Sequence, residues 1–280
     1  MSVKEVSNFL KDKQFCPSKK LGQNFLINPQ IKQRIVNAAN LQPKDIVLEI
    51  GPGVGAITSI LLTHKIKLIA IEVDKRLAEL LTTKLKTYNN FTLYNIDALK
   101  VDWDKILFEY TQSSDVKLVA NLPYSISSLL VLKIIRSQLI SQATIMVQKE
   151  MADRLCGKVG THAYNMFTIL VQLFLDVQKL FDVDPSNFSP KPKVQSCVIQ
   201  LTKKQPVSDL YDISDFEVID NFLHLAFSNK RKTLVNNLIA QYDKSKILNV
   251  LQQIQLPSMI RAEQINPCDL IKIMKALNND

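Results

Sequence analysis

Short apolar runs rich in β-branched residues alternate with helix-length amphipathic segments between about residues 45 and 150. The apolar runs predict strands at Ile46–Ile50, Leu68–Val73, Phe91–Asn95, Lys117–Ala120 and Ala143–Val147. The segments between them predict helices at Ala56–His64, Lys75–Lys86, Trp103–Tyr110 and Ser127–Leu139. Alternation at this spacing is typical of a doubly wound, mainly parallel α/β sheet with helices on both faces.

The chain after residue 150 first continues this pattern and then changes. One more helix and two more strands are predicted, at Asn165–Phe174, Val177–Val183 and Gln195–Leu201. From Ile213 to the end the sequence has no glycine, and its apolar residues follow helical spacing. We therefore expect an α/β domain over residues 1–204, a linker near Gln205–Asp209 and a small all-helical domain within residues 205–280.

The net charge of +9 is unevenly distributed along the chain. Residues 1–202 hold 25 Lys and Arg against 17 Asp and Glu, whereas residues 203–280 hold 10 against 9. A basic surface attracts phosphate groups because binding releases condensed counterions. Many soluble proteins are mildly basic, so composition alone leaves a nucleic-acid partner an open question.

Several classes of protein are disfavoured by what the sequence does not contain. No uncharged apolar run approaches the roughly 18 residues of a membrane span, and the charged N-terminus does not resemble a secretory signal. The three histidines are scattered, and the four cysteines form no C-x-x-C pair that would predict a metal site. We expect a cytoplasmic protein with reduced thiols at Cys16, Cys156, Cys197 and Cys268.

A glycine-rich turn follows the first predicted strand of the sheet. Gly51, Gly53 and Gly55 are three of the six glycines in the chain, and Glu49 precedes them. A dinucleotide site has the spacing G-x-G-x-x-G, which seats a pyrophosphate on a helix N-terminus. The G-x-G-x-G form with a preceding acid instead suits a cofactor that lacks phosphates and carries cationic groups. S-adenosylmethionine, with its α-amino and sulfonium groups, has this chemistry.

Acidic residues end the next two predicted strands. Glu72 lies at the end of the second predicted strand, where a carboxylate can accept both hydroxyl protons of a ribose. Asp97 follows the third strand and can accept a hydrogen bond from an adenine amino group. Each acid alone is more typical of a loop or a helix cap, but their order along successive strand ends indicates one cofactor site.

The fourth strand runs into Asn121-Leu122-Pro123-Tyr124. The lone pair of a base amino group is delocalised into the ring, so methylation requires that this nitrogen be held in a pyramidal form. The Asn121 amide oxygen and the Leu122 carbonyl can accept its two hydrogens, and Tyr124 can stack on a base taken out of its helix. The Tyr124 hydroxyl has no predicted part in this chemistry. A proline turn with a buried tyrosine is an equally good interpretation of the tetrapeptide alone.

Taken together, these motifs resemble the KsgA family of small-subunit (16S-type) rRNA adenine N6,N6-dimethyltransferases over nearly the full chain. The resemblance rests on Lys20–Leu26, Glu49–Gly55, Glu72–Asp74, Asp97–Leu99, Asn121–Tyr124, Phe188–Val194 and Arg231–Leu238. It implies a Rossmann-like methyltransferase sheet with a small helical C-terminal domain. It also implies that the enzyme, a monomer, dimethylates two adjacent adenosines near the 3′ end of small-subunit rRNA, within a subunit or pre-subunit particle, as a step of ribosome biogenesis.

The same resemblance assigns roles to individual residues. S-adenosylmethionine is expected to contact Asn24, Leu26, Gly51, Gly53, Glu72, Asp97 and Asn121. Tyr124 and Phe188 are expected to sandwich the target adenine, beside Asn121 and Leu122. Phosphate contacts are expected from Lys19, Lys20, Lys191, Lys193, Lys230, Arg231 and Lys232. In one departure from the family pattern, Asn165 stands where a glycine is expected after Tyr164.

Other interpretations stay open at this stage. Erm-type methyltransferases of large-subunit rRNA share the cofactor motifs, although Gly22, Leu122 and Arg231–Leu234 favour the small-subunit family. A non-catalytic binding protein of the same fold, such as a mitochondrial transcription factor, need not retain an intact Asn121–Tyr124. A role in ribosome assembly beside catalysis also stays open, whereas the glycine spacing disfavours a nicotinamide dehydrogenase.

Overall fold

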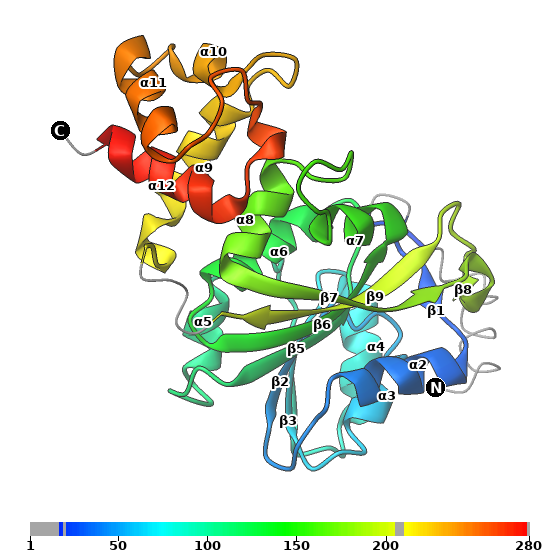
Figure 1. Ribbon diagram of the computed structural model, residues 1–280. Coiled ribbons are helices and arrows are strands. Elements are labelled where there is room, and N and C mark those ends of the chain that lie inside the picture. The colour runs from blue at the N-terminus through cyan, green and yellow to red at the C-terminus, as the bar shows by residue number, and fades with distance from the viewer. Residues whose placement is uncertain (1–16, 19–20, 205–209, 279–280) are drawn as a thin grey trace. The chain divides into compact units, whose positions relative to one another are not determined.

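The computed structural model describes residues 17–18, 21–204 and 210–278 (Figure 1). A seven-stranded sheet has the order β4-β3-β2-β5-β6-β9-β7. Its strands are β2 (Ile46–Ile50), β3 (Lys67–Ile71), β4 (Phe91–Tyr94), β5 (Val116–Asn121), β6 (Ile140–Gln148), β7 (Leu175–Val183) and β9 (Ser196–Lys203). Strands β2 to β6 pair in parallel, and β9 runs antiparallel to β6. The predicted doubly wound, mainly parallel α/β fold is confirmed.

The connections between strands are mostly helical. In the described residues up to 155, the helices are α2 (Pro29–Ala38), α3 (Thr58–Leu61), α4 (Lys75–Leu85), α5 (Trp103–Leu107), α6 (Ser127–Arg136) and α7 (Lys149–Leu155). A second, two-stranded sheet pairs β1 (Phe25–Leu26) with β8 (Phe188–Ser189), which follows the 3₁₀ turn Pro185–Asn187. No helix in the described part of the chain is long and apolar enough to cross a membrane.

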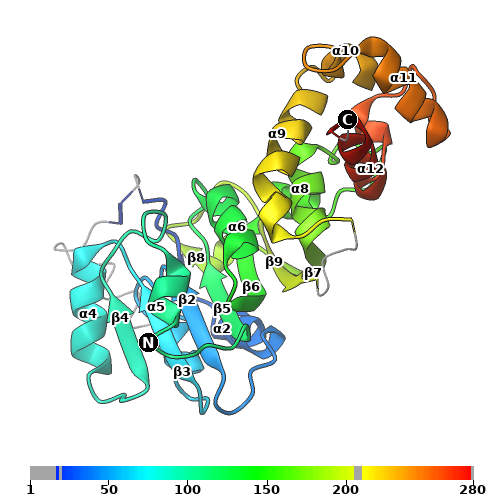
Figure 2. The ribbon, with the colours of Figure 1, turned by 90° about the vertical axis from the view of Figure 1, so that its left-hand side faces the viewer.

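Helices cover both faces of the large sheet, as Figures 1 and 2 show for α2 and α3 on one face and α5 and α6 on the other. On the first face, alternate strand residues such as Val47, Val119 and Val198 form one apolar cluster with residues of α2, α3 and α4. Residues 47–50 of β2 are all buried. Since neighbouring residues of a strand point to opposite sides, both faces of β2 are covered. This burial explains why β2 is an apolar run, interrupted only by Glu49, and not an alternation of apolar and polar residues.

The strand order creates one crevice at the carboxyl edge of the sheet. From β2 the chain moves outward through β3 to β4 and then returns to place β5 on the other side of β2. The loops after β2 and β5 therefore leave the sheet in opposite directions, and ligands of open α/β sheets bind at such a point. The glycine turn follows β2 and the Asn121–Tyr124 motif ends β5, so both flank this crevice.

The chain forms two compact units that do not coincide with the sequence-predicted domains of residues 1–204 and 205–280. Of the described residues, the first unit contains those up to 152 together with 178–202, and the second contains 153–177 together with those from 203 to 278. Residues 153–177 join the second unit because α8 (Met166–Phe174) packs against helices of the C-terminal segment. The predicted linker Gln205–Asp209 lies outside the described residues.

The second unit is helical, as predicted for the C-terminal part of the chain. Its helices after α8 are α9 (Phe216–Ala226), α10 (Leu234–Leu238), α11 (Lys244–Gln253) and α12 (Pro267–Asn278), with 3₁₀ turns at Ile213–Asp215 and Ala262–Gln264. Phe174 of α8 contacts the rings of Tyr211 and Phe216, each with ring centroids 5.7 Å apart. The Tyr211 hydroxyl also donates to the Leu173 carbonyl at 2.8 Å, which anchors α8 within this unit.

Candidate active site

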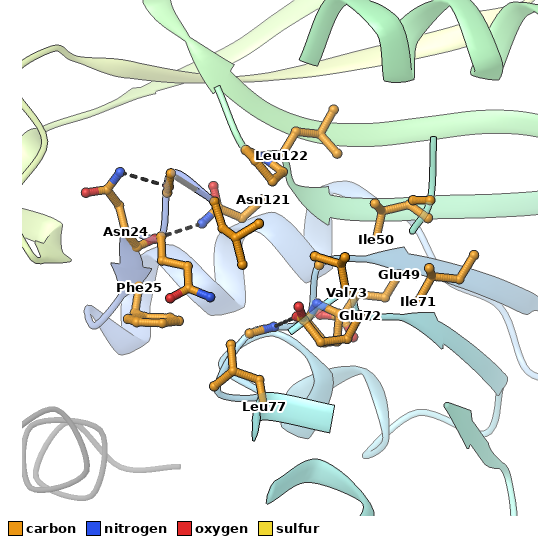
Figure 3. A pocket seen from close by; sticks show the side chains of 18 of the residues that line it. Asn24, Phe25, Glu49, Ile50, Ile71, Glu72, Val73, Leu77, Asn121 and Leu122 are labelled. Carbon is orange, nitrogen blue, oxygen red and sulfur yellow. Dashed lines mark hydrogen bonds between the residues drawn. The ribbon is translucent and has the colours of Figure 1, made fainter. Parts of the chain in front are cut away.

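A cavity of about 160 Å³ opens at the carboxyl edge of β2, β3 and β5, within the first unit. Its lining comes from residues 21–26, 49–54, 56–57, 71–73, 96–98 and 121–126, together with Leu77. In Figure 3, Asn24 and Asn121 lie at one end of the cavity, and Glu49 and Glu72 lie at the other. Five regions of the sequence, within residues 21–26, 49–57, 71–77, 96–98 and 121–126, thus meet at one place.

The cavity brings together all but one of the sequence-predicted cofactor and catalytic residues. Those that line it are Asn24, Leu26, Gly51, Gly53, Glu72, Asp97, Asn121, Leu122 and Tyr124. Phe188 is not in the lining; it is 3% exposed and packs in the apolar core, where it is paired with Leu26 between β8 and β1. A stacking role for Phe188 stays a prediction, and it requires the ring to leave this core.

The glycine turn after β2 needs glycine for its backbone conformation. Gly51, Gly53 and Gly55 have φ values of 66°, 59° and 79°, in the left-handed region that side chains disfavour. A Cβ at Gly53 would lie 3.2 Å from the Phe25 ring, whereas one at Gly51 would meet no atom within 4 Å. The turn is therefore packed on one side, and Gly51 leaves open space where it lines the cavity.

Glu72 ties this turn to the end of β3. Its side chain is 5% exposed, and its two oxygens accept hydrogen bonds from the amides of Gly53 at 3.0 Å and Asp74 at 2.9 Å. Burial raises the pKa of Glu72, and the two amides oppose that shift. Each oxygen has further lone pairs, so the carboxylate can also accept from the hydroxyl groups of a ligand in the cavity.

Glu49 is a buried acid without a full set of partners. It is 1% exposed, and burial raises its pKa to about 8, with a smaller contribution from the Glu72 carboxylate. Thr58 lies beside it and lowers the pKa, yet neither Thr58 Oγ1 nor Glu49 Oε2 has a partner with hydrogen-bond geometry in the described part of the chain. A cationic group on a ligand would stabilise the ionised form of Glu49. The Glu49 carboxyl fits the cationic amino group of S-adenosylmethionine. The Glu72 oxygens, which can accept hydrogen bonds from hydroxyl groups, fit its ribose.

Asp97 lies on the cavity wall after β4. Its Oδ1 accepts a hydrogen bond from the Leu99 amide at 2.9 Å, which fixes the carboxylate at the start of the following turn. The residue is half-buried, so the second oxygen can reach a ligand.

Asn121 closes the opposite end of the cavity. Its Nδ2 donates to the Asn24 carbonyl at 3.3 Å, so its Oδ1 remains available to accept a hydrogen bond from a ligand. The amide of the buried Leu122 donates to the Met146 carbonyl at 3.1 Å, which holds the loop after β5 against β6. Asn121 thus lines the cavity with its Nδ2 already bound, and its Oδ1 is the atom that the amino-group chemistry would use.

Tyr124 has two hydrogen-bonded contacts that the sequence did not predict. Its hydroxyl lies 2.6 Å from Oγ of Ser196, and its carbonyl accepts from Oγ of Ser127 at 3.0 Å. Ser196 begins β9, 72 residues further along the chain. No local sequence signal connects it to the loop after β5, so only the fold reveals the contact.

The segment before β1 is tied to the same region by Gln23. Gln23 Nε2 donates to Asp74 Oδ2 at 2.9 Å, and Arg76 binds the same carboxylate at 2.6 Å. The Arg76 hydrogen bonds hold the pKa of Asp74 below its usual value, with Gln23 adding to the effect. These contacts join residues 21–24, which line the cavity, to the start of α4.

The basic residues that were predicted to bind phosphate lie on loops. Lys191 and Lys193 are exposed between β8 and β9, and Lys230, Arg231 and Lys232 are exposed between α9 and α10. Lys19 and Lys20 lie outside the described residues.

Asn165, which departs from the family pattern, caps α8. Its side chain accepts from the amides of Phe167 and Thr168, and its own amide donates to Thr168 Oγ1. Its φ of −151° is extended, so this position does not require glycine. The described residues contain no group of three acidic, histidine or cysteine side chains that could hold a metal ion.

Comparison with known proteins gives consistent matches over nearly the whole chain. Residues 15–279 match the family described as "Ribosomal RNA adenine dimethylase". The chain is 47% identical to "Ribosomal RNA small subunit methyltransferase A" of Ureaplasma urealyticum, covering 99% of this chain and 98% of that protein. It is 35% identical to the protein of the same name from Natranaerobius thermophilus, and the match covers 99% of this chain and 97% of that protein.

Two solved structures are similar to the chain along most of their length. A dimethyladenosine transferase from Plasmodium falciparum superposes with a TM-score of 0.75 at 32% identity, covering 89% of this chain and 95% of that one. The 23S rRNA methyltransferase ErmE superposes with a TM-score of 0.69 at 24% identity, covering 91% and 100%, which shows a shared fold.

Binding of S-adenosylmethionine should release a proton from Glu49. With a pKa of about 8 the free protein holds this carboxyl protonated at pH 6–7, and a cationic ligand group lowers that pKa. Over this range the ligand α-amino group stays charged, so affinity should rise with pH by up to about tenfold per unit. Calorimetry in buffers of different ionisation enthalpy measures the proton release.

Glu49→Gln should abolish this release, whereas Glu79→Gln, which neutralises an exposed glutamate of α4, should retain it. Equal proton release by Glu49→Gln and the unmodified protein would show that Glu49 does not face the cationic group.

Proposed function

The chain belongs to the ribosomal RNA adenine dimethylase family, and from this premise we propose that it dimethylates two adjacent adenosines near the 3′ end of small-subunit rRNA. The methyl donor is S-adenosyl-L-methionine, and the acceptor is the exocyclic amino nitrogen of adenine. The observation that carries the proposal is one cavity that is lined by Glu49–Val54 and Glu72 at one end and by Asn121–Tyr124 at the other. One cavity can thus hold donor and acceptor next to each other.

The cofactor end of the cavity is built to hold a ligand without phosphates. When bound, S-adenosyl-L-methionine supplies an electrophilic methyl group. Glu72 would accept from its ribose hydroxyls and Glu49 would face its amino group, while Gly51 and Gly53 allow the backbone to approach it closely. Asp97 would accept from its adenine amino group.

The residues at the other end act on the target base. Asn121 Oδ1 and the Leu122 carbonyl would accept the two hydrogens of the amino group, which directs the nitrogen lone pair toward the methyl donor. Tyr124 would stack on the base after it leaves its helix. A strong general base is not needed, because the amino proton becomes acidic once nitrogen has gained the methyl group. This account agrees with a cavity that has no histidine or lysine in its described lining.

The choice of RNA rests on the relatives that cover nearly the whole chain. Two of them, at 47% and 35% identity, are named as methyltransferases of small-subunit rRNA. The similarity to ErmE supports only a common fold. We extend the proposal to a monomeric, cytoplasmic enzyme that acts on a small subunit or a pre-subunit particle during ribosome biogenesis. The exposed basic loops after β8 and after α9 would contact phosphates.

Incubation with labelled S-adenosylmethionine and separated, unmethylated small and large subunits tests the proposed substrate. Label should enter the small subunit, and nuclease digestion followed by mass spectrometry should yield N6,N6-dimethyladenosine. Equal amounts of both subunits in separate reactions provide the control. Label confined to large-subunit RNA would instead assign the chain to the Erm-type activity.

Salt should weaken binding to the small subunit steeply, since the basic loops replace condensed counterions on phosphates. Replacing Lys230, Arg231 and Lys232 together by alanine should reduce the slope of log affinity against log salt by up to about 0.9 per lost phosphate contact. Cofactor affinity should not change.

The matched control replaces Lys65, Lys84 and Lys86, three exposed lysines before β3 and β4 at the opposite edge of the sheet from the cavity. This control variant loses the same three positive charges as the first variant. Its slope of log affinity against log salt should stay close to that of the unmodified protein. The same slope change in both triple variants would mean that net charge, and not the loop after α9, determines RNA binding.

A further inference from the structure

We propose that Ser196 is a positioning residue for methyl transfer, because it holds the Tyr124 ring in the orientation in which that ring stacks on the target adenine. The inference rests on the proposed function, in which Tyr124 contacts the base. It adds a residue to the site that no sequence motif assigned and that does not line the cavity itself.

The contact between the two side chains is short and buried on one side. The Tyr124 hydroxyl lies 2.6 Å from Ser196 Oγ, and Ser196 is 0% exposed. Tyr124 is only half-buried and is one of the residues that line the cavity. The tyrosine therefore has one end in the cavity and its hydroxyl anchored inside the protein.

Ser196 is well suited to act as a fixed anchor. It is the first residue of β9 and pairs with Gln148 of β6 in the antiparallel part of the sheet. Directly before it, the Gln195 carbonyl accepts from the Lys149 amide at 2.9 Å. Because the strand ladder fixes the backbone here, the position of Ser196 Oγ depends on little more than its own χ1 rotation.

The backbone of Tyr124 is held independently. Ser127, which is also buried, donates through Oγ to the Tyr124 carbonyl at 3.0 Å, and the Ile126 amide donates to the Pro123 carbonyl at 3.2 Å. With the carbonyl bound by Ser127 and the hydroxyl by Ser196, the two side-chain torsions between them have little freedom. Fixing a contact group before the substrate arrives lowers the entropic cost of reaching the reactive geometry.

The contact does not require a chemical role for the hydroxyl. Burial raises the pKa of Tyr124, with Ser196 opposing the shift, so the hydroxyl stays protonated at neutral pH and is not a base. Its role is therefore to orient the ring. This revises the sequence-based prediction, which gave the hydroxyl no part and which implied that phenylalanine could replace Tyr124 at little cost.

The test compares Ser196→Ala, Tyr124→Phe and the double variant, using unmethylated small subunits as substrate. Single-turnover methyl transfer is measured at saturating RNA and cofactor, together with cofactor affinity and melting temperature. Each single variant should slow transfer by about tenfold to a hundredfold, the usual effect of a misplaced reacting group. The double variant should be no slower than the slower single variant, and cofactor affinity should be unchanged in all three.

A matched control is Thr144→Val on β6. Thr144 is also 0% exposed, and its hydroxyl has no hydrogen-bond partner in the described part of the chain. This variant removes a buried hydroxyl from the same sheet without touching Tyr124, and it should transfer at the unmodified rate. A rate loss in Thr144→Val as large as in Ser196→Ala would show a general packing effect and would overturn the proposal.

Tyr124→Ala separates failure of this inference from failure of the proposed function. If Tyr124→Ala is inactive while Ser196→Ala and Tyr124→Phe transfer at the unmodified rate, the ring acts on the base without Ser196, and the positioning role is wrong. If a folded Tyr124→Ala transfers normally, the stacking role in the proposed function fails. Additive losses in the double variant would also contradict the inference, because they would mean that Ser196 acts independently of the tyrosine hydroxyl. Should Ser196→Ala not fold, Tyr124→Phe removes the same hydrogen bond from the other side.

Discussion

The parallel pairing of β2 with β3 on one side and β5 on the other is the constraint on which the site depends. Since these strands end at the same edge, their C-terminal loops place the glycine turn, Glu72 and Asn121 around one cavity. Glu72 strengthens this arrangement, because its carboxylate joins the end of β3 to the Gly53 amide of the turn after β2. The acid that is proposed to hold the cofactor ribose thus also fixes the turn that receives the cofactor.

The two ends of the cavity solve different physical problems. At the end that contains Glu49, burial raises the pKa of this carboxyl to about 8, and a cationic ligand group would compensate its charge. At the end that contains Asn121 and Tyr124, the groups are neutral amides, carbonyls and an aromatic ring, and their proposed value lies in orientation. There the fold supplies rigidity through contacts outside the cavity, with Asn24 fixing the Asn121 amide and Ser196 and Ser127 fixing Tyr124.

Much of the fold and of the cavity lining could be predicted, because the strands β2, β3 and β5 are mostly apolar runs and the glycine turn, Glu72 and Asn121 stand at their ends. The strand Ile46–Ile50 is confirmed with both of its ends. Helix α2 was not predicted, although Asn28 caps it, Pro29 begins it and Ile31 and Ile35 lie one helical turn apart. The burial of Phe188 and the Ser196 contact could not be foreseen, since both depend on pairing between segments far apart in sequence. The role of each lining residue stays a prediction.

The central claim is that Asn121 lies where the methyl donor and the target amino group meet, and single-turnover transfer by Asn121→Ala at saturating cofactor and RNA tests it most directly. We predict a loss of about a hundredfold or more in rate, because the amino nitrogen is no longer oriented. The free energy of cofactor binding, measured on the same preparation, should weaken by no more than the contribution of one hydrogen bond, about 0.5–1.5 kcal/mol. A folded Asn121→Ala that transfers methyl groups at the unmodified rate would contradict the account.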